Sequence, residues 1–174
     1  MDLSKLKLVQ RLSISFAVLV IALVGVLALS LKQINELHTD VDLLVNDLFP
    51  KTVLANEAAG ETNKIASAVR SLFIGRNDPG FVREQRVKID DSFKIVAERL
   101  QQLDTLIVFP EGRLLFKTVS VQERQFKSIV TEFLRLYDDG QIGAAEGFLL
   151  KELRAAQKEN LDGMSALIAS QVQL

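Results

Sequence analysis

The chain opens with a long apolar stretch that predicts a membrane-spanning helix. From Leu12 to Leu31 no residue is charged, and three Ser and one Gly are the breaks in a run of Leu, Val, Ile, Ala and Phe. Twenty helical residues span about 30 Å, which is the thickness of the hydrocarbon core of a bilayer. The pattern therefore predicts a transmembrane helix over residues 12–31.

A cleaved signal peptide and a buried core helix are the two alternatives for this stretch. A signal peptide has a shorter apolar region followed by a cleavage site with small residues, and residues 32–35 offer no such site. A core helix of this length would carry a polar face. Lys5, Lys7 and Arg11 precede the stretch, and basic residues stay in the cytoplasm. We therefore expect residues 1–11 in the cytoplasm and residues 32–174 in the periplasm.

Beyond the membrane segment, apolar residues recur at spacings of three and four, and no window alternates with a period of two, so the pattern predicts helices and no strands. Pro50 is expected to kink the first outer helix rather than end it. A break at residues 75–80 follows, with Gly75 as a C-cap, Asp78 as an N-cap and Pro79 at the first helical position. Pro110 marks the next break, residues 138–140 the third, and the fourth helix begins at about residue 141.

Each predicted helix has one face for a shared core. The core positions are Ala55, Ala58, Thr62, Ile65, Val69 and Leu72 in the first helix, Val82, Arg86, Ile89, Phe93, Val96, Leu100, Leu103 and Ile107 in the second, Val119, Phe126, Val130, Phe133 and Tyr137 in the third, and Ile142, Ala145, Leu149, Leu153, Ala156, Asn160, Gly163 and Leu167 in the fourth. Short links make neighbouring helices antiparallel. The prediction is an all-α, up-down-up-down antiparallel four-helix bundle over residues 32–174. Its first helix is continuous with the transmembrane helix, and its fourth points back at the membrane.

Composition and charge exclude several classes of protein. The chain is 48% hydrophobic and 25% charged, with a net charge of −1. Its mean hydropathy of +0.21 is carried by the apolar stretch, because residues 33–174 hold 17 Lys and Arg against 21 Asp and Glu, a net of −4. The absence of Cys excludes a disulfide framework and a Cys-based zinc site. The near-neutral charge disfavours a nucleic-acid binder.

The sequence carries no enzyme signature. His38 is the single histidine, and there is no Gly-rich phosphate loop. The acid pairs at residues 90–91 and 138–139 are adjacent in sequence, so their side chains diverge on a helix. We therefore expect a protein that is not an enzyme and that has no metal site and no cofactor.

Three arginines near the outer end of the predicted bundle form a candidate anion site. Arg70, Arg86 and Arg135 are expected within roughly 5–9 Å of that end along the helix axes. Three guanidinium groups in one layer repel one another unless an anion joins them, and a carboxylate accepts bidentate hydrogen bonds from such groups. Tyr137 and Thr62 are candidates to add hydroxyl groups. The candidate ligand is a small carboxylate.

A purely structural role for these arginines is the alternative. Arg side chains extend from a packed face to water with their charged ends solvated. Glu84, Asp138 or Glu146 is an internal partner that would neutralise them. Under this alternative the chain is a membrane-anchored adaptor or structural protein with no small ligand.

Several features together resemble a known receptor architecture. They are the basic amino terminus, the membrane helix running into a helical bundle, Pro50, residues 67–70 with the sequence Ser-Ala-Val-Arg, and residues 131–134 leading into residues 137–140. The whole chain resembles the amino-terminal part of a methyl-accepting chemotaxis protein, of the four-helix-bundle kind found in aspartate and serine receptors. The resemblance implies a homodimer in the bacterial inner membrane.

In the aspartate receptor, arginines of the first outer helix bind ligand carboxylates across the dimer interface. Arg70 matches the last of these arginines, whereas the two earlier positions fall at Ala66 and Glu61. An organic acid bound by Arg70 with Arg86 or Arg135 therefore fits better than an amino acid of the same type.

The resemblance also implies how the signal leaves the bundle. A small axial slide of the fourth helix relative to the first would control a histidine kinase through cytoplasmic regions that lie outside this sequence. The same sensor on a histidine kinase or on a cyclic-dinucleotide enzyme is a further alternative. Small residues at Ala145, Ala155, Ala156 and Gly163 are compatible with a sliding fourth helix.

Overall fold

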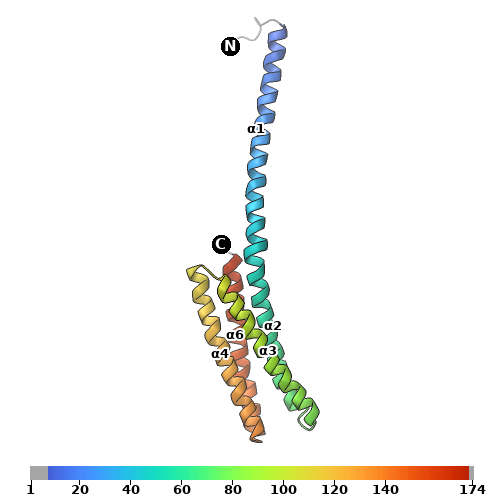
Figure 1. Cartoon of the computed structure of the whole chain (residues 1–174), viewed down its shortest axis with the longest axis vertical. Coiled ribbons are helices and arrows are strands. Elements are labelled where there is room, and N and C mark those ends of the chain that lie inside the picture. The colour runs from blue at the N-terminus through green and yellow to red at the C-terminus, as the bar shows by residue number, and fades with distance from the viewer. Residues whose placement is uncertain (1–7, 173–174) are drawn as a thin grey trace. The chain divides into compact units, whose positions relative to one another are not determined.

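The computed structural model describes residues 8–172, without the side chains of residues 8–12, 14, 35, 39, 40, 43, 171 and 172. The described part is helical and contains no strand. The elements are α1 (Leu8–Leu43), η2 (Leu44–Leu48), α2 (Phe49–Ile74), α3 (Pro79–Leu106), α4 (Pro110–Asp138), α5 (Ile142–Phe148), η3 (Leu149–Leu153) and α6 (Arg154–Val172), where η denotes a π-helical turn (Figure 1). The chain divides into two compact units, the first ending at Val45 and the second beginning at Asn46.

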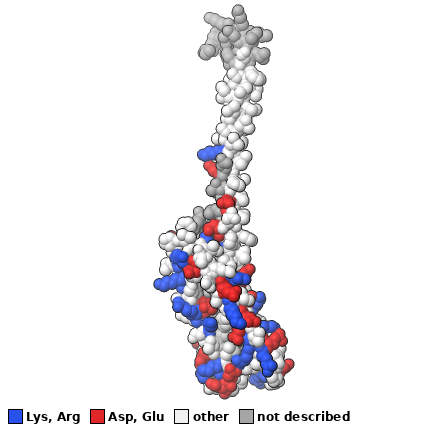
Figure 2. All heavy atoms as spheres, viewed as in Figure 1, with Lys and Arg blue, Asp and Glu red and all other residues white. Residues whose placement is uncertain are grey.

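The first unit consists mainly of the apolar helix α1. Within the described residues, Ser15–His38 is the one segment long and apolar enough, by length and composition, to cross a membrane. Its large side chains, such as Leu19, Ile21 and Leu29, are exposed, unlike those of a helix in the core of a soluble domain. In Figure 2 this stretch is almost free of charged side chains, whereas both signs of charge are interspersed over the second unit. These properties fit the predicted membrane helix.

The second unit is the predicted four-helix bundle. Helix α2 packs against α3 and α6, and α4 packs against α6, whereas α3 and α4 contact each other much less. The run α5–η3–α6 forms the fourth helix of the bundle. The hydroxyl of Tyr137 donates to the backbone oxygen of Leu72 at 3.1 Å, so the ends of α4 and α2 lie at the same level. The predicted all-α fold with antiparallel neighbours is confirmed.

Helix continuity follows the prediction at Pro50 and departs from it in the fourth helix. The chain stays helical through Pro50, and because proline has no N–H to donate, the turn before it widens into η2. The fourth helix was expected to be one regular helix from residue 141, but η3 divides it into α5 and α6. Two successive spacings of four residues, Ala145 to Leu149 to Leu153, drift about 80° off one face of a regular helix. The wider π turn restores that face and buries Ala145 and Leu153.

The turn between α2 and α3 has the predicted capping residues. Gly75 caps α2, with its N–H donating to the oxygen of Ser71 at 3.0 Å. The side chain of Asp78 accepts hydrogen bonds from the N–H groups of Gly80 at 2.9 Å and Phe81 at 3.1 Å. Pro79 is the first residue of α3. The predicted turn after α4 is also present, with Gly140 in the left-handed region at φ 72°.

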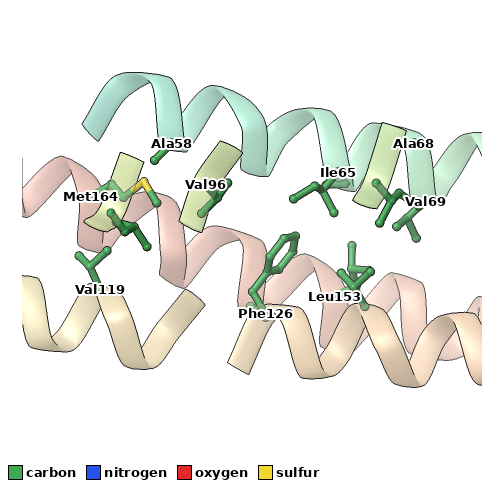
Figure 3. Packing of buried hydrophobic residues seen from close by; sticks show 14 of the residues in the cluster. Ala58, Ile65, Ala68, Val69, Val96, Val119, Phe126, Leu153 and Met164 are labelled. Carbon is green, nitrogen blue, oxygen red and sulfur yellow. The ribbon is translucent and has the colours of Figure 1, made fainter. Parts of the chain in front are cut away.

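The core of the bundle is built from the predicted faces. In Figure 3, Ile65 and Val69 of α2 point toward Phe126 of α4 and Leu153 of η3, whereas Val119 and Met164 lie at the level of Ala58. The α2 positions Ala55, Ala58, Thr62, Ile65, Val69 and Leu72 are all buried. Burial of such side chains is the main favourable term in folding. Met164, which was not among the predicted core residues, is also buried.

Candidate ligand-binding site

Two of the three predicted arginines lie together at the end of α4. A guanidinium nitrogen of Arg86 in α3 donates to Oδ1 of Asp138. Arg135 in α4 donates to Glu132 through Nε at 2.8 Å and Nη2 at 2.6 Å, and to Asp139 through Nη1 at 2.7 Å. Because Asp138 and Asp139 are adjacent, Arg86 and Arg135 lie near the same end of the bundle. Tyr137 is half-buried beside them.

Both of these arginines have carboxylate partners within the chain. The hydrogen bond with Glu132, aided by the charges of Glu132 and Asp139, raises the pKa of Arg135 above its usual range. The hydrogen bond from Arg135 likewise lowers the pKa of Glu132. Arg86 pairs with Asp138, one of the three internal partners considered from the sequence. The positive charges at this end are therefore largely compensated by neighbouring acids.

Arg70 has a different environment, because its partner is in α6. It is exposed, and its Nη2 donates to Oε1 of Gln157 in α6 at 2.6 Å. The Nε2 of Gln157 donates in turn to Oδ1 of Asn63 at 2.7 Å. Among the described residues, no hydrogen bond or ion pair links Arg70 to Arg86 or Arg135. Of the three predicted arginines, Arg70 is thus the one whose partner is a neutral amide.

Thr62 lies in the interior of the bundle. Its side chain is 1% exposed, and its hydroxyl lies 3.1 Å from the backbone oxygen of Ala58 and 3.2 Å from Oδ1 of Asn160 in α6. Eight helical residues, or about 12 Å along the axis, separate it from Arg70. The structure therefore places Thr62 apart from the arginines and in contact with α6.

Sequence reasoning missed a set of buried polar residues between α2 and α3. Glu61 of α2 and the pair Gln85 and Ser92 of α3 are buried. Burial acts to raise the pKa of Glu61, but hydrogen bonds from Lys64 and Ser92 and the charges of Lys64 and Arg99 outweigh it and hold that pKa below its usual value. The available signal was the spacing, because Gln85 and Ser92 are seven residues apart and each precedes a predicted core position.

Among the described residues, no group of three or more His, Asp or Glu side chains is arranged to hold a metal ion. The polar groups of the bundle instead form hydrogen bonds and ion pairs between helices. Of the three predicted arginines, Arg70 is the one that no carboxylate of the described residues compensates, so it is the one best able to bind an anion.

Comparison with known protein families agrees with the fold. The family described as a four helix bundle sensory module for signal transduction matches residues 5–174. The chain therefore belongs to the four-helix-bundle sensory modules of methyl-accepting chemotaxis proteins. No curated protein matches the chain. A sensory bundle together with one apolar helix long enough to cross a bilayer fits a membrane protein.

Proposed function

We propose that this chain is the sensory region of a bacterial transmembrane chemoreceptor that binds a small organic acid through Arg70. The bundle faces the periplasm, and the receptor acts as a homodimer in the inner membrane. The family supports the sensory role. The basic residues before α1 support the orientation.

The observation that carries the ligand assignment is the neutral partner of Arg70. A carboxylate forms a stronger, charge-assisted and bidentate pair with a guanidinium group than an amide oxygen does. A bound acid would therefore compete with Gln157 for Arg70. Since Gln157 also donates to Asn63, the competition changes a contact between α2 and α6.

The same contact supplies a route for the signal. We propose that a bound acid displaces α6 by a small axial step relative to α2, and that this step controls a histidine kinase through regions beyond residue 174. Packed helices shift between discrete arrangements of this kind. The small side chains of Ala155 and Ala156 and the absence of one at Gly163 are compatible with such a step.

Isothermal titration calorimetry tests the ligand assignment. The full 174-residue chain in lipid nanodiscs is titrated with succinate, malate and citrate. We expect heat from at least one acid, and a loss of affinity of about tenfold or more in Arg70→Ala, because a hydrogen bond to a charged group contributes about 1.5–3 kcal/mol. Arg83→Ala removes an exposed arginine of α3 and is the matched control. Unchanged affinity in Arg70→Ala contradicts the assignment.

A membrane-anchored adaptor without a small ligand is the second candidate. The internal ion pairs of Arg86 and Arg135 favour it, because they satisfy two of the three arginines without any ligand. This candidate predicts no heat from any of the three acids. It also predicts that the Arg70→Ala variant gives the same results as the parent chain in each of these titrations.

A further inference from the structure

A groove of about 590 Å³ lies between α2 and α3. Its floor is formed by residues that are buried, and its rim by residues that are exposed. The floor contains Glu61, Ala68, Gln85 and Ser92, and the rim includes Lys64 and Lys88. A volume of this size lies in the range of small-molecule sites. Its lining includes four small side chains, those of Ser67, Ala68, Ser71 and Ser92.

The floor of this groove is polar, which is unusual for the contact between two packed helices. Glu61 is 8% exposed, Ser92 is 6% exposed and Gln85 is 5% exposed. The hydroxyl of Ser92 donates to Oε2 of Glu61 at 2.7 Å, and Nζ of Lys64 donates to Oε1 at 2.6 Å. Gln85, in contrast, has no hydrogen-bond partner among the described residues. In the described residues the buried side-chain polar atoms without a partner are Oε1 of Gln122 and Nδ2 of Asn160, so the amide of Gln85 keeps contact with solvent in the groove. It is therefore a free donor and acceptor for a bound molecule.

The register of the two helices sets the positions of the charged groups. Glu61 and Ser92 face each other across the antiparallel pair. Lys64 lies three residues beyond Glu61 and Lys88 four residues before Ser92, so both lysines are about 5–6 Å along the axes from that hydrogen bond. Ala68 and Gln85 are each seven residues away, or about 10 Å. The lysines therefore stand on opposite walls, between the carboxylate of Glu61 and the amide of Gln85.

Both lysines and Glu61 keep free hydrogen-bonding capacity. An ammonium group has three donors, and Lys64 uses one on Glu61 and Lys88 one on Glu84. Each carboxylate oxygen of Glu61 accepts one bond, and carboxylates have about four acceptor sites. Glu61 and Asp91 balance the two lysines, so the lining has no net formal charge.

From this geometry we propose that the α2–α3 groove is a second binding site, for a small zwitterion that carries both a carboxylate and an ammonium group. The carboxylate lies between Lys64 and Lys88, the ammonium group is held by Glu61, and a polar side group bonds the amide of Gln85. A simple dianion is repelled by the carboxylate of Glu61, and a simple cation is repelled by the two lysines. The site belongs to one chain and lies on the α3 side of α2, whereas Arg70 contacts α6.

Calorimetry on the full chain in nanodiscs tests the proposal with matched probes. L-serine and L-glutamine are compared with 3-hydroxypropanoate and glutaramate, which are the same acids without the ammonium group. We expect heat from at least one of the two amino acids and none from the deaminated compounds. Gln85→Leu is expected to weaken binding by about tenfold or more. Gln101→Leu, the same change at an exposed position of α3, is expected to leave binding unchanged.

Folding and location are controlled by two further measurements. Thermal unfolding of Gln85→Leu is expected close to the temperature of the parent chain, since the change removes no hydrogen bond within the described residues. Ser67→Phe, at the exposed rim, blocks the groove without changing its floor and is expected to abolish binding. Equal binding of 3-hydroxypropanoate and L-serine, or unchanged affinity in Gln85→Leu or Ser67→Phe, overturns the proposal. If Arg70→Ala alone abolishes binding of the amino acids, the site near Arg70 stands and the groove is excluded.

Discussion

Thr62 of α2 and Asn160 of α6 meet in the centre of the bundle although they are 98 positions apart in the sequence. The Thr62 hydroxyl lies 3.2 Å from Oδ1 of Asn160, and Asn160 is fully buried. Its Nδ2 has no partner among the described residues, and neither has the buried Oε1 of Gln122 in α4. One layer of the interior is therefore polar and links the two helices that carry the proposed signal.

Removing one member of this pair is expected to destabilise the bundle. Thr62→Val keeps the shape of the side chain but leaves the Asn160 amide without its partner. A buried group left unpaired costs about 1–3 kcal/mol, so the free energy of unfolding should fall by that amount. Urea titration of the chain in detergent micelles, followed by circular dichroism, measures the change.

The double variant Thr62→Val with Asn160→Leu is the control for this reading. Replacing both polar groups by apolar ones of similar size is nearly neutral or stabilising. We therefore expect the second change to restore most of the loss. A double variant that loses the sum of the two single effects shows that the pair is not coupled.

Gly163 of α6 lies against Gln122 of α4. A Cβ atom at residue 163 would lie 2.1 Å from Oε1 of Gln122 and 3.4 Å from Cγ2 of Val119. Ala is favoured over Gly inside a helix by about 1 kcal/mol, but here the Gln122 side chain must first move. Gly163→Ala is therefore expected to stabilise the chain by less than this in the parent and by the full amount in Gln122→Ala. The test compares the melting temperatures of the parent chain, Gly163→Ala, Gln122→Ala and the double variant. If Gly163→Ala raises the melting temperature equally with and without Gln122→Ala, the contact between the two residues is contradicted.

The fold could be predicted from the sequence because its main signals are local. The spacings that run from Ala55 to Leu72 and from Ile89 to Ile107 define the faces that are buried, and Asp78 and Pro79 define a helix start. The site was harder to predict because it depends on which side of a helix meets which neighbour. The sequence predicts Arg70 and Arg86 at similar levels along the helix axes, but the side chain of Arg70 reaches α6 and that of Arg86 reaches α4. Gln85 is one residue from Arg86, and a rotation of about 100° separates the buried Gln85 from the half-buried Arg86.

The N-cap of α3 gives a prediction independent of the site. Asp78 satisfies two N–H groups in the first turn of α3, and loss of such a cap costs about 0.5–2 kcal/mol. Asp78→Ala should lower the free energy of unfolding by this amount. Asp78→Asn keeps an acceptor oxygen and should lose only a small part of it. If the two variants are equally destabilised, the cap acts through its charge rather than its hydrogen bonds.

Glu61 is expected to make the bundle less stable in acid. Its pKa is held below 4.5, so as the pH falls below 4.5 the unfolded chain takes up the proton first. The stability that Glu61 contributes is present above pH 4.5 and is lost as the pH falls through the folded value. Glu61→Gln should abolish this part of the pH dependence. Urea titrations in steps from pH 3 to pH 7, at constant ionic strength, give the free energy of unfolding at each pH. They show whether its slope against pH differs between the parent chain and Glu61→Gln.

Glu123 of α4 is expected to show the opposite behaviour. Burial raises its pKa above the usual 4.5, although the charges of Lys127 and Arg124 act to lower it. Above pH 4.5 the folded chain therefore keeps a proton that the unfolded chain has released, and stability falls as the pH rises through the folded value. Glu123→Gln removes the cost of ionising this half-buried carboxyl. The variant should be more stable than the parent at pH 7, and the two should converge near pH 4.5. An equal difference in stability at both pH values would show that Glu123 acts through packing and not through its charge.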